Sequence, residues 1–285
     1  MNQHERAATF RQLHHQPPLV LPNAWDAGSA RVIEQAGASA IATTSAGVSW
    51  AHGRRDGQGL PRAQAVEAVR HIVETVAIPV SADIEGGYGD GTPDALADTV
   101  RAMLDVGVVG VNIEDTPGRD GMPIRAPAEQ AARIQAAREA AEQAGIDLFI
   151  NARTDLYLRA LGDPGERLEA TLERAALYLE AGADSLFVPG VTDVATIRAL
   201  AAGIDAPLNI LAGVGAPGIP TLAELGVARV SLGPEVALGA FALMRDAVQE
   251  VLSTGTYRRL DHGLSFGEID ALFADRSRSA DGPDG

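Results

Sequence analysis

The chain has 285 residues and 46% hydrophobic content, enough for a large core, and its formal net charge of −15 argues against a nucleic-acid partner because phosphate binding needs clustered cations. It contains no cysteine, and all 23 basic residues are arginine, which excludes a thiolate nucleophile, cysteine-ligated zinc and a Schiff-base lysine. No apolar run approaches the roughly 20 residues of a membrane span, and the N-terminus lacks the apolar core of a signal peptide, so we expect a cytoplasmic protein with no membrane partner.

Short apolar runs, typical of buried parallel strands, recur along the chain. They lie at residues 19–22, 38–44, 78–83, 108–114, 148–153, 185–189, 208–212 and 229–232. Stretches with a helical spacing of apolar positions lie between them, at residues 62–76, 95–106, 126–144, 164–181, 193–202, 220–225 and 234–253. Thr92 precedes Pro93, as expected for an N-cap followed by proline in the first helical turn.

This regular alternation predicts a (β/α)8 TIM-type barrel of the α/β class, with a doubly wound open sheet as the alternative. We expect one barrel domain spanning residues 1–274, which includes a further C-terminal helix at residues 266–273. The tail at residues 275–285 is polar and contains glycine and proline, so we expect it to be disordered. Barrel active sites lie at the carboxyl ends of the strands, so residues that follow the apolar runs are the candidates for chemistry.

Acidic residues and one arginine follow three of these runs. Asp83 and Glu85 come at the end of the third run and, two residues apart, are expected to point the same way; Glu114 ends the fourth run and Arg153 the fifth. Converging carboxylates suit Mg²⁺ or Mn²⁺, whereas zinc is disfavoured because the histidines avoid the strand ends. Arg153 could clamp a carboxylate or balance an enolate. The alternative is a set of structural ion pairs, in which Arg153 binds Asp155 or Glu114.

Loops at the predicted barrel mouth carry further candidates. The backbone N–H groups of residues 45–47 and the Ser45 hydroxyl could hold an anionic oxygen, although Thr-Thr-Ser-Ala-Gly by itself is typical of a turn. Asp56 is a candidate base or orienting acid. Tyr88 lies in a glycine-rich loop that is either part of a lid over the mouth or only a turn. The loop at residues 116–127 is longer than most connections, as is common in lids that exclude water.

Five segments, taken together and in order, resemble the isocitrate lyase / phosphoenolpyruvate mutase superfamily. They are Pro22-Asn23-Ala24-Trp25-Asp26, Thr43-Thr44-Ser45-Ala46-Gly47, Asp83-Ile84-Glu85-Gly86-Gly87-Tyr88-Gly89, Asn112-Ile113-Glu114-Asp115 and Asn151-Ala152-Arg153-Thr154-Asp155. The resemblance covers roughly residues 10–255, and the chain looks most similar to the shorter, phosphonomutase-like branch. It implies a Mg²⁺-dependent barrel that binds a 2-oxo acid or its enolate. It also implies a homo-oligomer, usually a tetramer made of two dimers whose C-terminal helices swap between paired subunits.

The resemblance implies a role for each candidate residue. Asp83 would ligate the metal directly, and Glu85 and Glu114 would do so directly or through water. Arg153 would bind the carboxylate or enolate oxygen of the substrate, and Asp56 would occupy the position of a catalytic loop carboxylate. The main-chain and side-chain groups expected to complete the substrate site are those of Ser45, Ala46, Gly47, Tyr88 and Asn112.

The loop at residues 116–127 departs from the family pattern. Isocitrate-type lyases carry lysine, cysteine and histidine there, and the mutases carry lysine and asparagine, whereas this chain has Arg119-Asp120-Gly121-Met122-Pro123. We therefore expect a Mg²⁺-dependent lyase that cleaves a C–C bond of a small 2-oxo or 2-hydroxy (di)carboxylate through an enolate. The alternatives are a phosphonopyruvate-type mutase or hydrolase, and a 2-oxo-acid-binding protein whose catalysis has decayed. The candidates for the proton donor are Tyr88, Asp56 and a water held by this loop.

Overall fold

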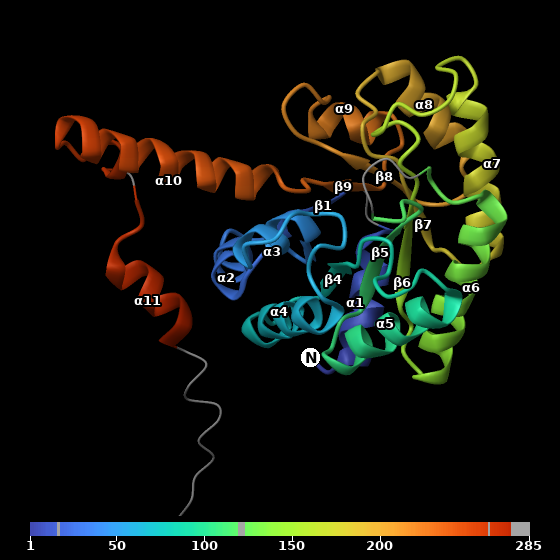
Figure 1. Ribbon diagram of the computed structural model, residues 1–285, viewed down its shortest axis with the longest axis horizontal. Coiled ribbons are helices and arrows are strands. Elements are labelled where there is room, and N and C mark those ends of the chain that lie inside the picture. The colour runs from blue at the N-terminus through green and yellow to red at the C-terminus, as the bar shows by residue number, and fades with distance from the viewer. Residues whose placement is uncertain (16–17, 119–122, 262, 275–285) are drawn as a thin grey trace, which may run out of the picture.

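The computed structural model describes residues 1–15, 18–118, 123–261 and 263–274. The tail expected at residues 275–285 and the part of the long loop at residues 119–122 lie outside the described residues. Parallel strands form one sheet in the order β1-β9-β8-β7-β6-β5-β4-β3-β2, which curls into a barrel (Figure 1). The strand bounds are β1 Leu19–Leu21, β2 Asn23–Ala24, β3 Ile41–Thr43, β4 Val80–Asp83, β5 Gly110–Glu114, β6 Phe149–Arg153, β7 Ser185–Phe187, β8 Leu208–Leu211 and β9 Arg229–Ser231.

Pro22 divides the first predicted strand into β1 and β2, and this division closes the barrel. β1, before Pro22, pairs with β9, and β2, after it, pairs with β3. Proline has no N–H group to donate to a strand ladder, so it suits the point at which the chain changes pairing partners. Because β1 and β2 are one continuous segment, the sheet has the architecture of a (β/α)8 barrel, and the predicted fold class is confirmed.

Helices alternate with the strands, and α4 to α9 lie around the outside of the barrel (Figure 1). Those predicted from residue 62 onward are present with bounds that differ by a few residues, whereas α1, α2 and α3 were not predicted. α1 begins at a capping box made by Asn2 and Glu5, and α2 begins at one made by Asp26 and Ser29. The bounds are α1 Gln3–Leu13, α2 Ala27–Gln35, α3 Ser45–Ala51, α4 Arg62–Thr75, α5 Pro93–Asp105, α6 Pro127–Gln143, α7 Arg167–Glu180, α8 Val194–Gly203, α9 Ile219–Glu224, α10 Glu235–Thr254 and α11 Phe266–Ala274, with a 3₁₀ turn at Arg258–Leu260.

Aromatic side chains from α1 plug the amino-terminal end of the barrel. Phe10 is fully buried and packs edge-on against Phe149, the first residue of β6, with ring centroids 5.5 Å apart. A side chain at Gly110, the first residue of β5, would place its Cβ 2.7 Å from the Phe10 ring, so only glycine admits the plug there. His14 stacks on Phe149 at a centroid distance of 3.9 Å. The barrel is therefore closed below, and access to its interior is from the carboxyl ends of the strands.

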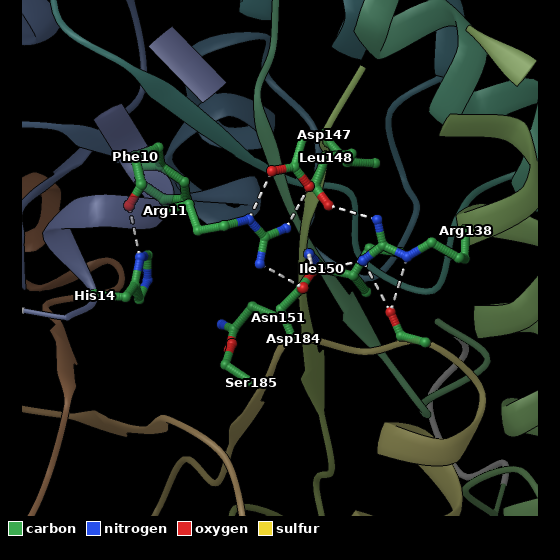
Figure 2. Close-up of polar contacts among 11 residues, drawn as sticks. Phe10, Arg11, His14, Arg138, Asp147, Leu148, Ile150, Asn151, Asp184 and Ser185 are labelled. Atoms are coloured by element: carbon green, nitrogen blue, oxygen red, sulfur yellow. Dashed lines mark hydrogen bonds and ion pairs between the residues drawn. The ribbon is translucent and has the colours of Figure 1, made fainter. Parts of the chain in front are cut away.

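Partly exposed ion pairs tie this plug to the loops that precede β6 and β7 (Figure 2). Arg11 of α1 donates to both Asp147 oxygens, at 2.6 and 2.7 Å, and to Asp184 at 2.8 Å. Arg138 of α6 donates to the other Asp184 oxygen at 2.6 Å. One carboxylate thus joins two helices at the base of the barrel, on the side opposite to the predicted site.

Helix α10 projects away from the barrel (Figure 1). Its base is held by Phe241, which packs against Trp25 and Trp50 with ring centroids 6.4 and 6.2 Å away. Beyond that base it carries exposed apolar side chains, among them Leu243, Met244, Val248 and Leu252. Among the described residues no helix combines the length and the apolar character needed to cross a membrane.

Candidate active site

A cavity of about 310 Å³ opens at the carboxyl ends of the strands. Asp83 is in register with Asn112 on the next strand, and Asn112 is in register with Asn151. Side chains in register lie on the same face of the sheet, which here is the inside of the barrel. Barrel interiors are usually filled with branched apolar residues, so a polar interior such as this one points to a ligand site. The strand residues that line the cavity include Asn23, Thr43, Ser81, Asp83, Asn112, Arg153, Phe187, Leu211, Arg229 and Ser231.

Asp83, the last residue of β4, is held in a fixed orientation by its neighbours. One carboxylate oxygen accepts hydrogen bonds from the Asn112 amide at 3.1 Å and the Glu85 backbone N–H at 3.2 Å. The other accepts from the Ser45 hydroxyl at 2.8 Å and the Ser45 backbone N–H at 3.2 Å. Asn112 is oriented in turn by the Asn151 amide, which donates to its oxygen at 3.1 Å. The carboxylate is therefore pre-organised before any ligand binds.

Ser45 begins helix α3, so the expectation that residues 45–47 form a turn was wrong. Thr44 is the N-cap, and the first backbone N–H of the helix points at Asp83, where the positive end of the helix dipole favours an anion. The Ser45 hydroxyl, which donates its one proton to Asp83, also lies near Asp56 and acts to lower the pKa of Asp56. Burial, followed by the Asp83 charge, raises the pKa of Asp56.

Glu85 lies beyond the end of β4, so the expectation that it points the same way as Asp83 along one strand was wrong. Its φ of 52° is in the left-handed region, which breaks the alternation of an extended strand. Its side chain is buried and bonds to the Gln58 backbone N–H and to Tyr88. Burial, with the charges of Asp56 and Asp83, raises the pKa of Glu85 to about 7.

Tyr88 is only 5% exposed and belongs to the core, so it does not lie over the mouth as a lid. Its hydroxyl bonds to Glu85, and burial together with that negative charge holds its pKa well above its usual value. The sequence suggested a flexible loop because four of six residues at 86–91 are glycine. Those glycines instead allow tight contacts, such as the approach of Arg133 to the backbone oxygens of Gly86 and Gly91.

Arg153, at the end of β6, lines the cavity while it binds two carboxylates. Its Nε donates to Asp155 at 2.6 Å and its Nη1 lies 3.1 Å from Glu114. Burial disfavours the charged guanidinium, but the two carboxylates outweigh it and hold the pKa of Arg153 above its usual value. Asp155 is oriented by Thr116, whose hydroxyl donates at 2.6 Å. The predicted structural ion pairs are therefore present, and Arg153 still faces the cavity that a ligand would enter.

The fit of Mg²⁺ can be judged from this donor set. Among the described residues, no three histidine, cysteine, aspartate or glutamate side chains converge closely enough to hold a metal ion by themselves. Glu114 is engaged by Arg153, whereas Glu85 has one oxygen, Oε1, that is buried without a partner in the described part of the chain. Mg²⁺ keeps several waters and needs only one or two protein carboxylates. Asp83, with Glu85 acting through water, therefore fits Mg²⁺ better than three direct carboxylate ligands would.

The cavity brings together most of the predicted site residues, but not all of them. Those that line it are Ser45, Ala46, Asp56, Asp83, Asn112 and Arg153. Glu114 lines an adjoining hollow of about 500 Å³ that shares Asp56 and Arg153 with the cavity. Gly47, Glu85 and Tyr88 lie behind the cavity wall, and Gly47 packs so closely on Trp25 that an added Cβ would come within 2.8 Å of it.

The cavity also contains residues that the sequence analysis missed. The most notable is Arg229, which lies within an apolar run and is 2% exposed. Asn23 accepts hydrogen bonds from the backbone N–H groups of Leu232 and Gly233, at 3.0 and 2.8 Å, and so positions the loop after β9. A charged residue inside an otherwise apolar strand was the available signal for Arg229, because such a residue is rarely buried without a reason.

Comparison with known proteins identifies relatives of this chain. The family model described as phosphoenolpyruvate phosphomutase matches residues 10–252. The 2-methylisocitrate lyase of Escherichia coli (strain K12) is 32% identical over 262 residues, which cover 88% of this chain and 84% of that one. The 2,3-dimethylmalate lyase of Eubacterium barkeri is 32% identical over 64% of this chain and 62% of its own. The crystal structure of a proposed phosphonomutase from Burkholderia cenocepacia J2315 is 46% identical, with a TM-score of 0.82 over 86% of this chain and 99% of that one.

Proposed function

Because the chain belongs to the phosphoenolpyruvate phosphomutase family, within the isocitrate lyase / phosphoenolpyruvate mutase superfamily of lyases and mutases, we propose that it is a Mg²⁺-dependent lyase. Its substrate is a small 2-oxo or 2-hydroxy carboxylate, and the bond that breaks is a C–C bond next to the oxidised carbon. The observation that carries this proposal is the cavity in which Asp83 and Arg153 face a common space in a chain without lysine or cysteine. That set supports enolate chemistry and offers no amine for a Schiff base.

Four residues that line the cavity have a role in the proposed reaction. Arg153 binds the carboxylate or the developing enolate oxygen, and Glu114 and Asp155 keep its guanidinium in place. Asp83 would hold Mg²⁺, and Ser45 and Asn112 fix the orientation of the Asp83 carboxylate. Bound Mg²⁺ supplies Lewis acidity that polarises the substrate oxygen.

Asp56 is the group we propose for proton transfer. The other two candidates were Tyr88 and a water held by the loop at residues 116–127. Tyr88 does not line the cavity and its hydroxyl interacts with Glu85, and residues 119–122 of the loop lie outside the described residues. Asp56 lines both the cavity and the adjoining hollow, so it can reach a substrate and bulk water alike. A carboxylic acid in that place can deliver a proton to the enolate carbon and regain it from solvent.

Phosphonate chemistry is the second candidate function. It is favoured by the 46% identity to the proposed Burkholderia phosphonomutase. The missing lysine and asparagine in the loop at residues 116–127 argue against it, as the sequence analysis found. A phosphonate enzyme would release inorganic phosphate or convert phosphonopyruvate to an isomer, which a C–C lyase does not do.

The test is a substrate panel with product identification by NMR. The Mg²⁺-loaded enzyme is incubated with oxaloacetate, alkylmalates, 2-methylisocitrate and phosphonopyruvate, alongside Asp83→Ala and the surface control Asp98→Ala. Pyruvate or another oxo acid, lost in Asp83→Ala and retained in Asp98→Ala, supports the lyase. Phosphate release supports the phosphonate branch. Tight Mg²⁺-dependent binding of 2-oxo acids without any turnover indicates a protein whose catalysis has decayed.

We also propose that the protein works as a homo-oligomer. The apolar side chains along α10 border a groove of about 420 Å³, and such a large exposed apolar surface usually marks an interface. A second copy that contributes its own α10 is the occupant with matching chemistry. The tetramer implied by the family resemblance would contain two such pairs.

A further inference from the structure

Arg229 is a buried cation on the wall of the cavity. Its Nη1 has no hydrogen-bond partner among the described residues, and its Nε lies 3.4 Å from the Ser231 hydroxyl, longer than a normal hydrogen bond. Burial lowers its pKa to about 9, and the charge of Asp83 opposes this shift. A charge removed from water is costly unless it is paired and fully hydrogen-bonded, so this residue is unexpected in a structural role.

The two arginines of the cavity differ in their surroundings. Arg153 binds Glu114 and Asp155, which balance its charge. No ion pair to Arg229 exists in the described part of the chain, and the side chains beside it on the inward face of the strands, Asn209 and Ser231, are neutral and bonded to each other. The charge of Arg229 is therefore available to bind an anionic group of a ligand in the cavity.

Arg229 also lies away from the Asp83 side of the cavity. Its strand, β9, is separated from β6 by β7 and β8, and from β4 by β3 and the joined β1 and β2. The wall between the two sides includes apolar side chains, namely those of Leu158, Phe187, Pro189 and Leu211. The cavity therefore offers an anion site at each end and a short apolar stretch between them.

We infer that Arg229 is a specificity-determining residue that binds the carboxylate at the far end of the substrate. The first carboxylate lies at Asp83 and Arg153, and for that end the inference rests on the proposed function. A guanidinium matches a carboxylate with two parallel N–H donors, which suits recognition of this group. The cavity of about 310 Å³ is at the small end of ligand sites, as a short carbon chain requires.

The test compares two ligands that differ only at the distal end. Malate carries a carboxylate where 2-hydroxybutyrate carries a methyl group. Isothermal titration calorimetry with Mg²⁺ present measures the Kd of both, and NMR of each sample verifies that the ligand is intact. The proteins are the wild type, Arg229→Met, Arg229→Lys and the matched control Arg198→Met, which removes an exposed arginine outside the cavity.

The wild type is expected to prefer malate. Arg229→Met should weaken malate binding about 10- to 100-fold, the usual effect of losing a charged hydrogen-bonded contact, and change 2-hydroxybutyrate binding less than about 3-fold. Arg229→Lys should keep part of the preference, and Arg198→Met all of it. Without ligand, Arg229→Met should be at least as thermally stable as the wild type, because it removes an unpaired buried charge.

Equal affinity of the wild type for malate and 2-hydroxybutyrate overturns the inference. An equal loss of affinity for the two ligands in Arg229→Met also overturns it. If Arg229→Met does not fold, the wild-type preference and the Arg229→Lys variant decide. If the wild type binds neither ligand, the substrate panel alone decides the proposed function, and succinate against butyrate then tests Arg229. A rise in Tm with succinate that Arg229→Met lacks upholds the anion site, and no such difference rejects it.

Discussion

His14 makes the stability of the barrel depend on pH in a way that can be calculated from its surroundings. The side chain is 4% exposed, stacks on Phe149 and donates from Nδ1 to the Phe10 carbonyl oxygen at 2.8 Å (Figure 2). Burial, followed by the charge of Arg229, lowers its pKa from 6.5 to about 3; Arg11 and His15 act in the same direction. The folded protein therefore holds His14 neutral at pH values where the unfolded chain binds a proton.

The sign and size of the effect follow from this difference in pKa. Below pH 6.5 His14 binds a proton in the unfolded state but stays neutral in the native state. The free energy of unfolding therefore falls as the pH falls, until the native pKa near 3 is reached. At about 1.36 kcal/mol per pKa unit, the loss between pH 7 and pH 5 that is due to His14 is about 2 kcal/mol. Aspartate and glutamate residues add their own dependence, which is the same in any variant that changes only this histidine.

Urea unfolding at pH 7 and pH 5 measures this contribution. His14→Gln keeps a donor for the Phe10 oxygen but does not titrate, so its stability should fall by about 2 kcal/mol less than that of the wild type over this interval. His4→Gln, which removes an exposed histidine from the same helix, should behave like the wild type. A fall in His14→Gln within about 0.5 kcal/mol of the wild-type fall would refute the assignment of a buried neutral imidazole.

Three further changes test the proposed site and assembly. Asp83→Ala should lower activity by at least ~100-fold, as expected for a main electrostatic group, and addition of EDTA should do the same to the wild type; activity that survives both rules out the metal assignment. Arg153→Lys keeps the charge but loses the fork that binds Asp155 and the substrate, so kcat/KM should fall ~10- to 100-fold, and an unchanged value would show that Arg153 is structural. Leu243→Asp with Met244→Asp, on the exposed face of α10, should reduce the mass measured by light scattering, whereas a wild-type mass would place the interface elsewhere.

The candidate site contains residues that were placed correctly from sequence and residues that were not. Asp83 and Arg153 were found from sequence because each follows an apolar strand, and parallel strands bring their carboxyl ends together. Glu85 and Tyr88 were misplaced because both have a positive φ, which no strand periodicity can reveal. Their side chains turn behind the cavity wall, where they support the site without lining it.

Some helices could likewise be predicted from sequence and others could not. α4 to α10 carry apolar positions at helical spacing and were predicted, whereas α1 was not, because it buries little more than Ala7 and Phe10. Its place is set by contacts with Gly110 and Phe149, which are distant in the chain. The sequence predicts a turn at the start of α3, because a short Ser-Ala-Gly segment has no helical pattern of its own.

The strands, their alternation with helices and the acidic strand ends can be predicted from sequence, because burial on a strand or a helix imposes a periodicity on nearby residues. The division of a strand at Pro22, which closes the barrel, and the pairing of charges emerge only when the chain is folded. Arg153 and Arg229 both occupy inward-facing strand positions. Arg153 forms ion pairs with two carboxylates, whereas Arg229 forms none among the described residues. Charge pairing depends on distances across the barrel, and those distances exist only after the sheet has closed.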